Sequence, residues 1–160
     1  MPTLDVTIRE FRPGDEAAFR RLNEEWIKRY FAMESKDEAS LADPGRNIIE
    51  PGGRIFLAFQ EEQAVGCCAL LRMGPEEFEV AKMAVTEASQ GAGIGRRLLE
   101  SAIAAGRSLG GRRLYLETNR KLTRAIRLYE SLGFRHIPPE RLIPSPYARS
   151  NVSMELYLEV

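Results

Sequence analysis

The segment 78–100 constrains the fold of this chain more than any other part of the sequence. It begins with a mostly apolar run from Phe78 to Val85, continues through a glycine-rich loop at 90–95, and then shows apolar residues at helical spacing. This pattern predicts a buried strand, a loop and a helix in direct succession. A helix that begins inside a glycine-rich loop presents unpaired backbone N–H groups at the positive end of its dipole. The sequence therefore predicts an anion site near the loop, with phosphate as the usual ligand.

The residues of the loop distinguish between three phosphate-binding motifs. A Walker loop ends in Gly-Lys-Ser or Gly-Lys-Thr, whereas Gly95 is followed by two arginines. A dinucleotide fingerprint requires Gly or Ala where this chain has Arg96. The remaining motif is Q-x-x-G-x-G at Gln90, Gly93 and Gly95, with the strand KMAV before it and LYLETN and AIRLYESLGF after it, within 114–134. These blocks, in this order, resemble the GNAT superfamily of acetyltransferases.

The rest of the chain predicts an α+β fold. Alternating apolar residues and turn signals indicate strands at 6–11, 54–59, 64–72, 78–85, 113–118, 134–137 and 152–158. The three strands between 54 and 85 are joined by short turns and must be antiparallel, whereas a helical crossover makes 113–118 parallel to 78–85. We expect a single domain over 1–160, with a mixed, mostly antiparallel sheet of six or seven strands and helices on both faces, as in the GNAT fold.

Composition excludes several classes of partner. Lys plus Arg and Asp plus Glu both number 23, so the chain lacks the basic excess of proteins that bind nucleic acid or anionic membranes non-specifically. Cys67 and Cys68 are adjacent on a predicted strand and point to opposite faces, so we expect reduced core residues and no metal site. The N-terminus has no apolar signal region and no run is long enough to span a bilayer, which predicts a cytoplasmic protein without a membrane partner.

The resemblance implies transfer of an acetyl group from acetyl-CoA, as co-substrate, to an amine. In the family, the pantetheine arm of the coenzyme enters a gap between the strands that correspond here to 78–85 and 113–118. The Met83 N–H would stabilise the negative charge that develops on the thioester oxygen. The residues that the resemblance implies for the coenzyme are Met83, Ala84, Val85, Gln90, Gly91, Ala92, Gly93, Ile94, Gly95, Arg96, Asn119 and Tyr129.

Two side chains are candidates for the proton transfers. Tyr129 occupies the position where the family commonly places a tyrosine that protonates the departing thiolate; its alternative is a core residue of an amphipathic helix. Glu79 occupies the position of a general base in some members; its alternative is a solvent-facing residue at the strand start, with a water chain serving instead. Glu117 is a weaker candidate for the base. For Asn119, the alternative to a coenzyme contact is a turn that caps the next helix.

The acceptor site is the part that the sequence specifies least. Tyr30, Glu34 and Arg149 come from the two segments that flank the acceptor pocket in the family. A carboxylate there (Glu34, or Asp37 and Glu38) favours a cationic amine, and Arg149 favours a substrate that carries a carboxylate. Both together suit an amino acid or a short peptide. The leading interpretation is an N-acetyltransferase for a small-molecule amine. The alternatives are a protein or peptide N-acetyltransferase and a non-catalytic module that binds coenzyme A; the acyl group, the acceptor and a possible homodimer remain open.

Overall fold

The computed structural model describes residues 5–159, and its strands form one seven-stranded sheet in the order β1-β2-β3-β4-β5-β7-β6. All neighbouring strands are antiparallel except β4 and β5, which are parallel. The expected mixed, mostly antiparallel sheet is therefore confirmed. The strands are β1 Val6–Glu10, β2 Arg54–Gln60, β3 Gln63–Arg72, β4 Glu77–Val85, β5 Arg113–Thr118, β6 Arg135–His136 and β7 Val152–Tyr157.

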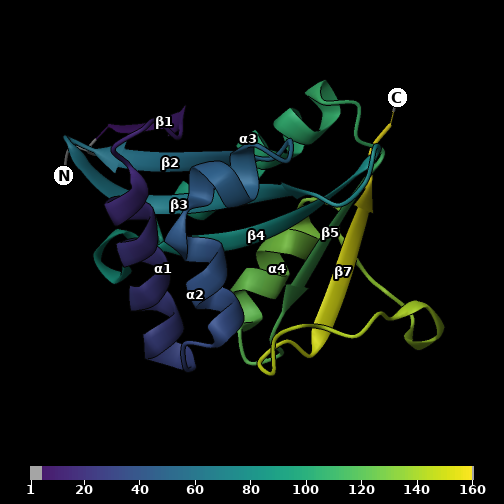
Figure 1. Cartoon of the computed structure of the whole chain (residues 1–160). Helices are drawn as coiled ribbons and strands as arrows, with labels where there is room; N and C mark the ends of the chain where they lie inside the picture. Colours follow the sequence, from purple (N-terminus) through teal and green to yellow (C-terminus); the bar gives the residue numbers. More distant parts are fainter. Residues whose placement is uncertain (1–4, 160) are drawn as a thin grey trace.

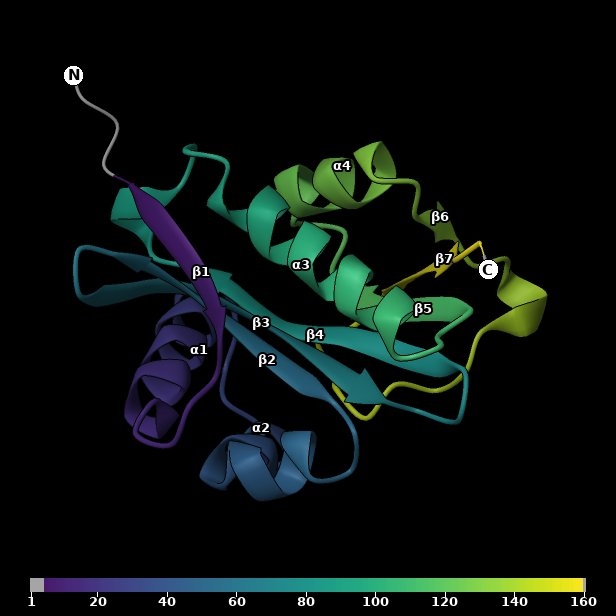
Figure 2. The ribbon, with the colours of Figure 1, turned by 90° about the horizontal axis from the view of Figure 1, so that it is seen from above.

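Helices cover both faces of the sheet, as the sequence predicted. Helices α1 (Glu16–Tyr30) and α2 (Ser35–Ala42) lie on one face, and α3 (Ile94–Ser108) and α4 (Thr123–Ser131) lie on the other (Figures 1 and 2). Single helical turns at Gly45–Ile49, Glu87–Ser89 and Pro139–Arg141 complete the connections. Among the helices of residues 5–159, none has both the length and the apolar character needed to cross a bilayer.

Each face of the sheet carries its own hydrophobic core, and the adjacent cysteines illustrate the division. Cys67 packs with Phe19 and Leu22 of α1, whereas Cys68 packs with Leu98 and other residues on the α3 side. Both cysteines are fully buried and unbridged, and their places in separate cores confirm that they lie on opposite faces of β3. The alternation of side chains along a strand thus divides one apolar run between two cores.

The parallel pair β4 and β5 separates after a short contact. The two strands are in register only from Glu77 with Arg113 to Glu79 with Tyr115. Figure 1 shows them diverging beyond this point, with α4 behind the opening. The predicted gap between the strands is present, and it exposes the last part of β4 on the side facing β5.

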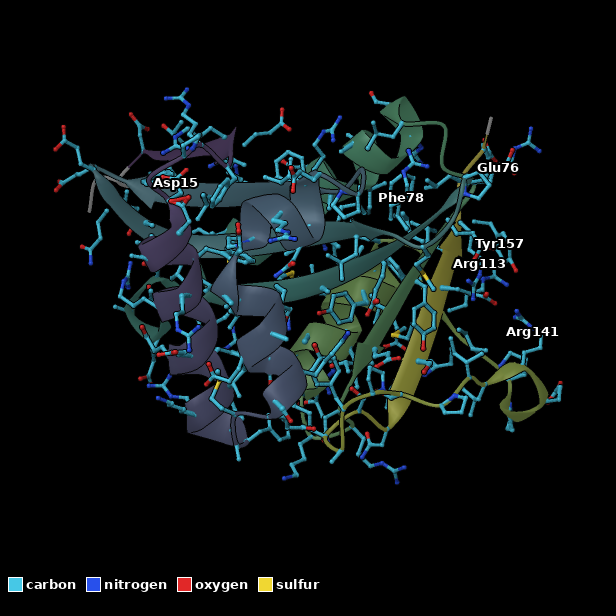
Figure 3. The ribbon with its side chains drawn as sticks, viewed as in Figure 1. Asp15, Glu76, Phe78, Arg113, Arg141 and Tyr157 are labelled. Carbon is cyan, nitrogen blue, oxygen red and sulfur yellow. The ribbon has the colours of Figure 1, made fainter. Side chains whose placement is uncertain are left out.

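The outer strands depart from the simple alternation that the sequence predicted. Glu155 of β7 belongs to the polar set of that strand, but only 5% of its surface is exposed. Arg113 of β5 donates to its carboxylate at 2.8 Å, and Arg141 of the 138–151 segment binds it from the other side. Figure 3 shows Arg113, Arg141 and Tyr157 gathered at this edge. Arg113 and Arg141 thus pack against the Glu155 carboxylate and pair its charge where it is buried.

Candidate active site

A cleft of about 1060 Å³ opens where β4 and β5 part. One end is lined by the glycine loop and the start of α3, and the middle by residues 79–85 of β4 and by α4. The other end is lined by the C-terminal part of α1, by α2 and by residues 146–150. The cleft therefore joins the predicted anion site to the segments that the sequence predicted for the acceptor.

The glycine loop presents a row of unpaired backbone donors. Gly91 and Gly93 have φ values of 87° and 77°, and nothing lies within 4 Å of where a β-carbon would stand on either residue. The N–H of Arg97 donates to the Gly93 carbonyl, but no backbone carbonyl of the described residues accepts from the N–H groups of 91–96. These donors, together with the helix dipole, form the geometry that binds an anion such as a pyrophosphate.

Side chains next to the loop are engaged in holding it in place. Gln90 donates to the Val85 carbonyl at 3.3 Å and ties the loop to the end of β4. Arg96 donates to the Ser131 hydroxyl at 2.7 Å while it lines the cleft. Arg97 instead donates to the Val6 carbonyl at 2.9 Å, toward β1. Of the two arginines, only Arg96 lies where its charge can reach an anion in the cleft.

Strand β4 contains a bulge beside the cleft, at Lys82. Its φ of 55° is left-handed, and the register with β3 shifts between the pairs Cys67–Ala84 and Ala69–Ala81. Two β4 residues therefore lie opposite one β3 residue, which turns the backbone out of the regular ladder. Met83, the next residue, lines the cleft together with Ala84 and Val85. A single lysine in an apolar strand was the one sign of this bulge in the sequence.

Tyr129 projects from α4 into the middle of the cleft. It is 8% exposed and packs edge-on against Phe134, with 6.0 Å between the ring centroids. Among the described residues, every fully buried side-chain oxygen has a hydrogen-bond partner. The Tyr129 hydroxyl has no partner among these residues, so it is not fully buried and must reach the open cleft. Burial raises the pKa of Tyr129 well above its usual value near 10. The phenol is therefore protonated at neutral pH and able to donate.

Glu79 and Glu117 form a carboxylate pair across the opening between the strands. Glu79 lies opposite Tyr115, two residues before Glu117, and both carboxylates line the cleft. Glu117 accepts hydrogen bonds from the Tyr115 hydroxyl at 2.8 Å and from the Ser145 hydroxyl. Burial, and then the charge of Glu117, raise the pKa of Glu79 to about 7. Glu79 thus lies in the cleft wall rather than facing solvent, with a pKa suited to a base at neutral pH.

Asn119 occupies the turn that follows β5. Its Oδ1 accepts from the Lys121 N–H at 2.9 Å, and its Nδ2 donates to the Arg149 carbonyl at 2.6 Å. Both contacts are with the protein, although the residue also lines the cleft. This geometry favours the alternative role, in which Asn119 shapes the start of α4 and anchors the segment around Arg149.

The two charged residues predicted for the acceptor are paired with other protein groups. Arg149 donates to both carboxylate oxygens of Asp37, at 2.7 and 2.6 Å, and lies 3.3 Å from Glu34. A guanidinium with two carboxylate partners has no free charge for a third, so the structure does not support Arg149 as a receptor for an acceptor carboxylate. Tyr30 lines the cleft and is 44% exposed, beside the Trp26 ring at 6.1 Å. Asp37, which the sequence offered as one possible acceptor carboxylate, forms an ion pair at this end of the cleft with Lys82, which the sequence did not single out for the site.

The comparisons with known proteins agree with this geometry. The model of the acetyltransferase (GNAT) family matches residues 17–134. An uncharacterized N-acetyltransferase of Schizosaccharomyces pombe is 30% identical over 139 residues, which cover 84% of this chain and 85% of that protein. An uncharacterized N-acetyltransferase of Bacillus subtilis is 30% identical over 98 residues, and this chain covers 63% of its length.

The fold has close counterparts among solved structures. An acetyltransferase of the GNAT family from Staphylococcus aureus Mu50 superimposes with a TM-score of 0.88 at 22% identity, over 97% of this chain and 100% of that one. The family match extends from α1 to the residue before β6 and so includes β4, the glycine loop and Tyr129. The chain belongs to the acetyltransferase (GNAT) family.

Proposed function

We propose that this protein transfers the acetyl group of acetyl-CoA to the primary amine of a small molecule, by direct attack within a ternary complex. The observation that carries the proposal is the row of unpaired N–H groups at 91–96, which opens into a cleft that also holds Tyr129 and Glu79. A pyrophosphate-bearing donor, a proton donor and a proton acceptor can therefore occupy one continuous space.

The coenzyme half of the site is built mainly from backbone groups. The N–H groups of Gly91 to Arg96 would bind the pyrophosphate, and Arg96 would add positive charge. The extended pantetheine arm would lie along Met83 to Val85, where β4 has lost its partner β5, and pair with it as an added strand. The bulge at Lys82 leaves the Met83 N–H outside the regular ladder, where it could donate to the thioester oxygen.

The chemical step requires two proton transfers at opposite sides of the thioester. An alkylamine with a pKa of about 10.4 is mostly ammonium at neutral pH and must lose a proton before its nitrogen can attack. Glu79, with a pKa of about 7, is the acceptor of that proton. The new C–N bond forms at the carbonyl carbon, the C–S bond breaks, and the departing thiolate takes a proton from the Tyr129 hydroxyl.

The experiment that tests the function measures thiol release from acetyl-CoA with a panel of small amines, alongside calorimetry with coenzyme A. We expect the wild type to release thiol only when an amine is present. We expect both the wild type and the variant Tyr129→Phe to bind coenzyme A. In Tyr129→Phe, turnover should fall about 100-fold with little change in coenzyme affinity. Binding without turnover of any small amine, peptide or protein would favour the non-catalytic module. Acetylation found only on peptides or proteins, by mass analysis, would favour the second alternative.

A further inference from the structure

Asp37 is a fully buried carboxylate at the acceptor end of the cleft. It lies in the first turn of α2, and its side chain has 0% exposure. Its carboxylate accepts two hydrogen bonds from Arg149, at 2.7 and 2.6 Å, and one from the Glu34 N–H at 3.0 Å. An unpaired buried carboxylate would be strongly destabilising, so these contacts account for its ionised state. Asp37 therefore joins α2 to the segment around Arg149.

The same carboxylate also neutralises the cation of the β4 bulge. Lys82 Nζ lies 3.4 Å from Asp37 Oδ1 and 3.0 Å from the Tyr147 hydroxyl, and its side chain is 6% exposed. Arg149, which is 13% exposed, has Glu34 as a second carboxylate partner. The two part-buried cations Arg149 and Lys82 are thus matched by the two carboxylates of Asp37 and Glu34. Lys36 and Lys121 also line the cleft, but neither forms an ion pair with these two carboxylates.

The carboxylates on the opposite wall have no comparable neutralisation. Glu117 is held by two neutral hydroxyl groups, those of Tyr115 and Ser145, which orient it without cancelling its charge. Glu79 has no ion-pair partner within 4 Å among the described residues. Lys82 and Lys36 lie near enough to favour the charged form of Glu79. Lys82, however, is bound to Asp37, and Lys36 is exposed, so water screens the charge of Lys36.

We propose that Asp37 determines the charge selectivity of the acceptor site: by neutralising Arg149 and Lys82, it leaves Glu79 and Glu117 to face the acceptor. The acceptor is then a cationic amine that carries no carboxylate beside its amino group. This inference rests on the proposed N-acetyltransferase function and narrows its substrate class. It reverses the expectation from the sequence, in which Arg149 would bind the carboxylate of an amino acid.

Matched pairs of acceptors test the selectivity in the full-length wild type. Suitable pairs are ethanolamine with serine, tyramine with tyrosine and cadaverine with lysine. The amides of the same amino acids serve as controls, because an uncharged amide replaces the carboxylate. We expect kcat/KM for the amine to exceed that for the amino acid by about tenfold or more, with the amide closer to the amine. Equal or better use of the free amino acids would overturn the inference while leaving the acetyltransferase function intact. Absence of thiol release with every acceptor would overturn the function itself.

The substitution Asp37→Asn tests the residue to which the selectivity is assigned. It keeps the shape of the side chain but releases the charges of Arg149 and Lys82, so the preference for the amine over the amino acid should fall about tenfold. The matched control is Glu38→Gln, the next residue of α2, whose carboxylate binds Arg20 at the surface. A ratio that changes equally in both variants, or in neither, would contradict the role of Asp37.

A second variant makes the test independent of how well Asp37→Asn folds. Glu117→Gln removes one of the carboxylates that face the acceptor and should lower the same ratio by raising the use of amino acids relative to amines. Lys36→Gln should leave the ratio unchanged. A preference for amino acids that disappears in Lys36→Gln would show that Lys36 receives an acceptor carboxylate, and it would refute the proposal.

Discussion

The carboxylate pair makes the pH dependence of catalysis a direct test of the base. Burial and the charge of Glu117 raise the pKa of Glu79 to about 7 from an ordinary value of 4.5. Only the ionised form of Glu79 can take a proton from an ammonium, so kcat/KM should rise as pH rises through this pKa. Replacing Glu117 with glutamine removes a like charge, which should lower the pKa of Glu79 and move the acidic limb of the profile to lower pH.

The size of the effect follows from the fraction of Glu79 that is ionised. With a pKa of about 7, roughly 3% of this side chain is a carboxylate at pH 5.5. Loss of one nearby like charge typically lowers a pKa by about one unit, which would leave roughly a quarter ionised at that pH. When each profile is normalised to its own high-pH plateau, kcat/KM at pH 5.5 should therefore be about eightfold higher in Glu117→Gln than in the wild type.

The assay is thiol release between pH 5 and pH 9 with one acceptor throughout, so that the ionisation of the amine contributes equally to every profile. Glu79→Gln should lack the limb near pH 7. Glu77→Gln is the control, because Glu77 lies on the same strand but binds Arg113 outside the cleft. If Glu79→Gln keeps the wild-type limb, Glu79 is not the base; if Glu117→Gln leaves the limb where it was, the two carboxylates are not coupled.

Two further experiments test the anion site and the ion pairs of Glu155 in β7. Gly93→Ala and Gly110→Ala both place a side chain at a left-handed φ in open space, 77° and 82°, so each should lower stability by about 1 kcal/mol. Only Gly93→Ala should weaken coenzyme A binding in calorimetry, and equal affinities would contradict the loop assignment. Arg141, with Arg113, lowers the pKa of Glu155 to about 2 from 4.5. The ionised Glu155 therefore contributes its full stabilisation of the fold above pH 4.5, and this contribution is lost as pH falls toward 2. In denaturant unfolding at pH 7, Glu155→Gln should be less stable than the wild type by on the order of 2 kcal/mol, after allowing for the exposure of Arg141. This difference in stability should vanish near pH 2. A difference that does not depend on pH would refute the role of the ionised Glu155.

Features that depend on neighbouring residues were predictable from the sequence alone. The glycine loop and the start of α3 follow from the conformational freedom of glycine and from helical spacing. The direction of β4 relative to β3 and β5 follows from the length of the connections between them, and the structure has these directions. The opposite placement of Cys67 and Cys68 follows from the alternation of side chains along a strand. In each case the physical cause acts over a few residues.

The charge pairing at the proposed acceptor site was decided by tertiary structure. Arg149 meets Asp37 across 112 residues of chain, and this contact changes an expected ligand receptor into a neutralised structural group. The burial of Glu79 and its distance from Glu117 depend on where β4 and β5 separate, and the bulge at Lys82 depends on pairing with β3. Burial and charge pairing sum over residues that are distant in sequence, because the electrostatic energy of a group depends on everything that surrounds it in space. The sequence alone was therefore sufficient to predict the glycine loop at the start of α3, while the charge pairs behind the proposed selectivity became visible only in the folded chain.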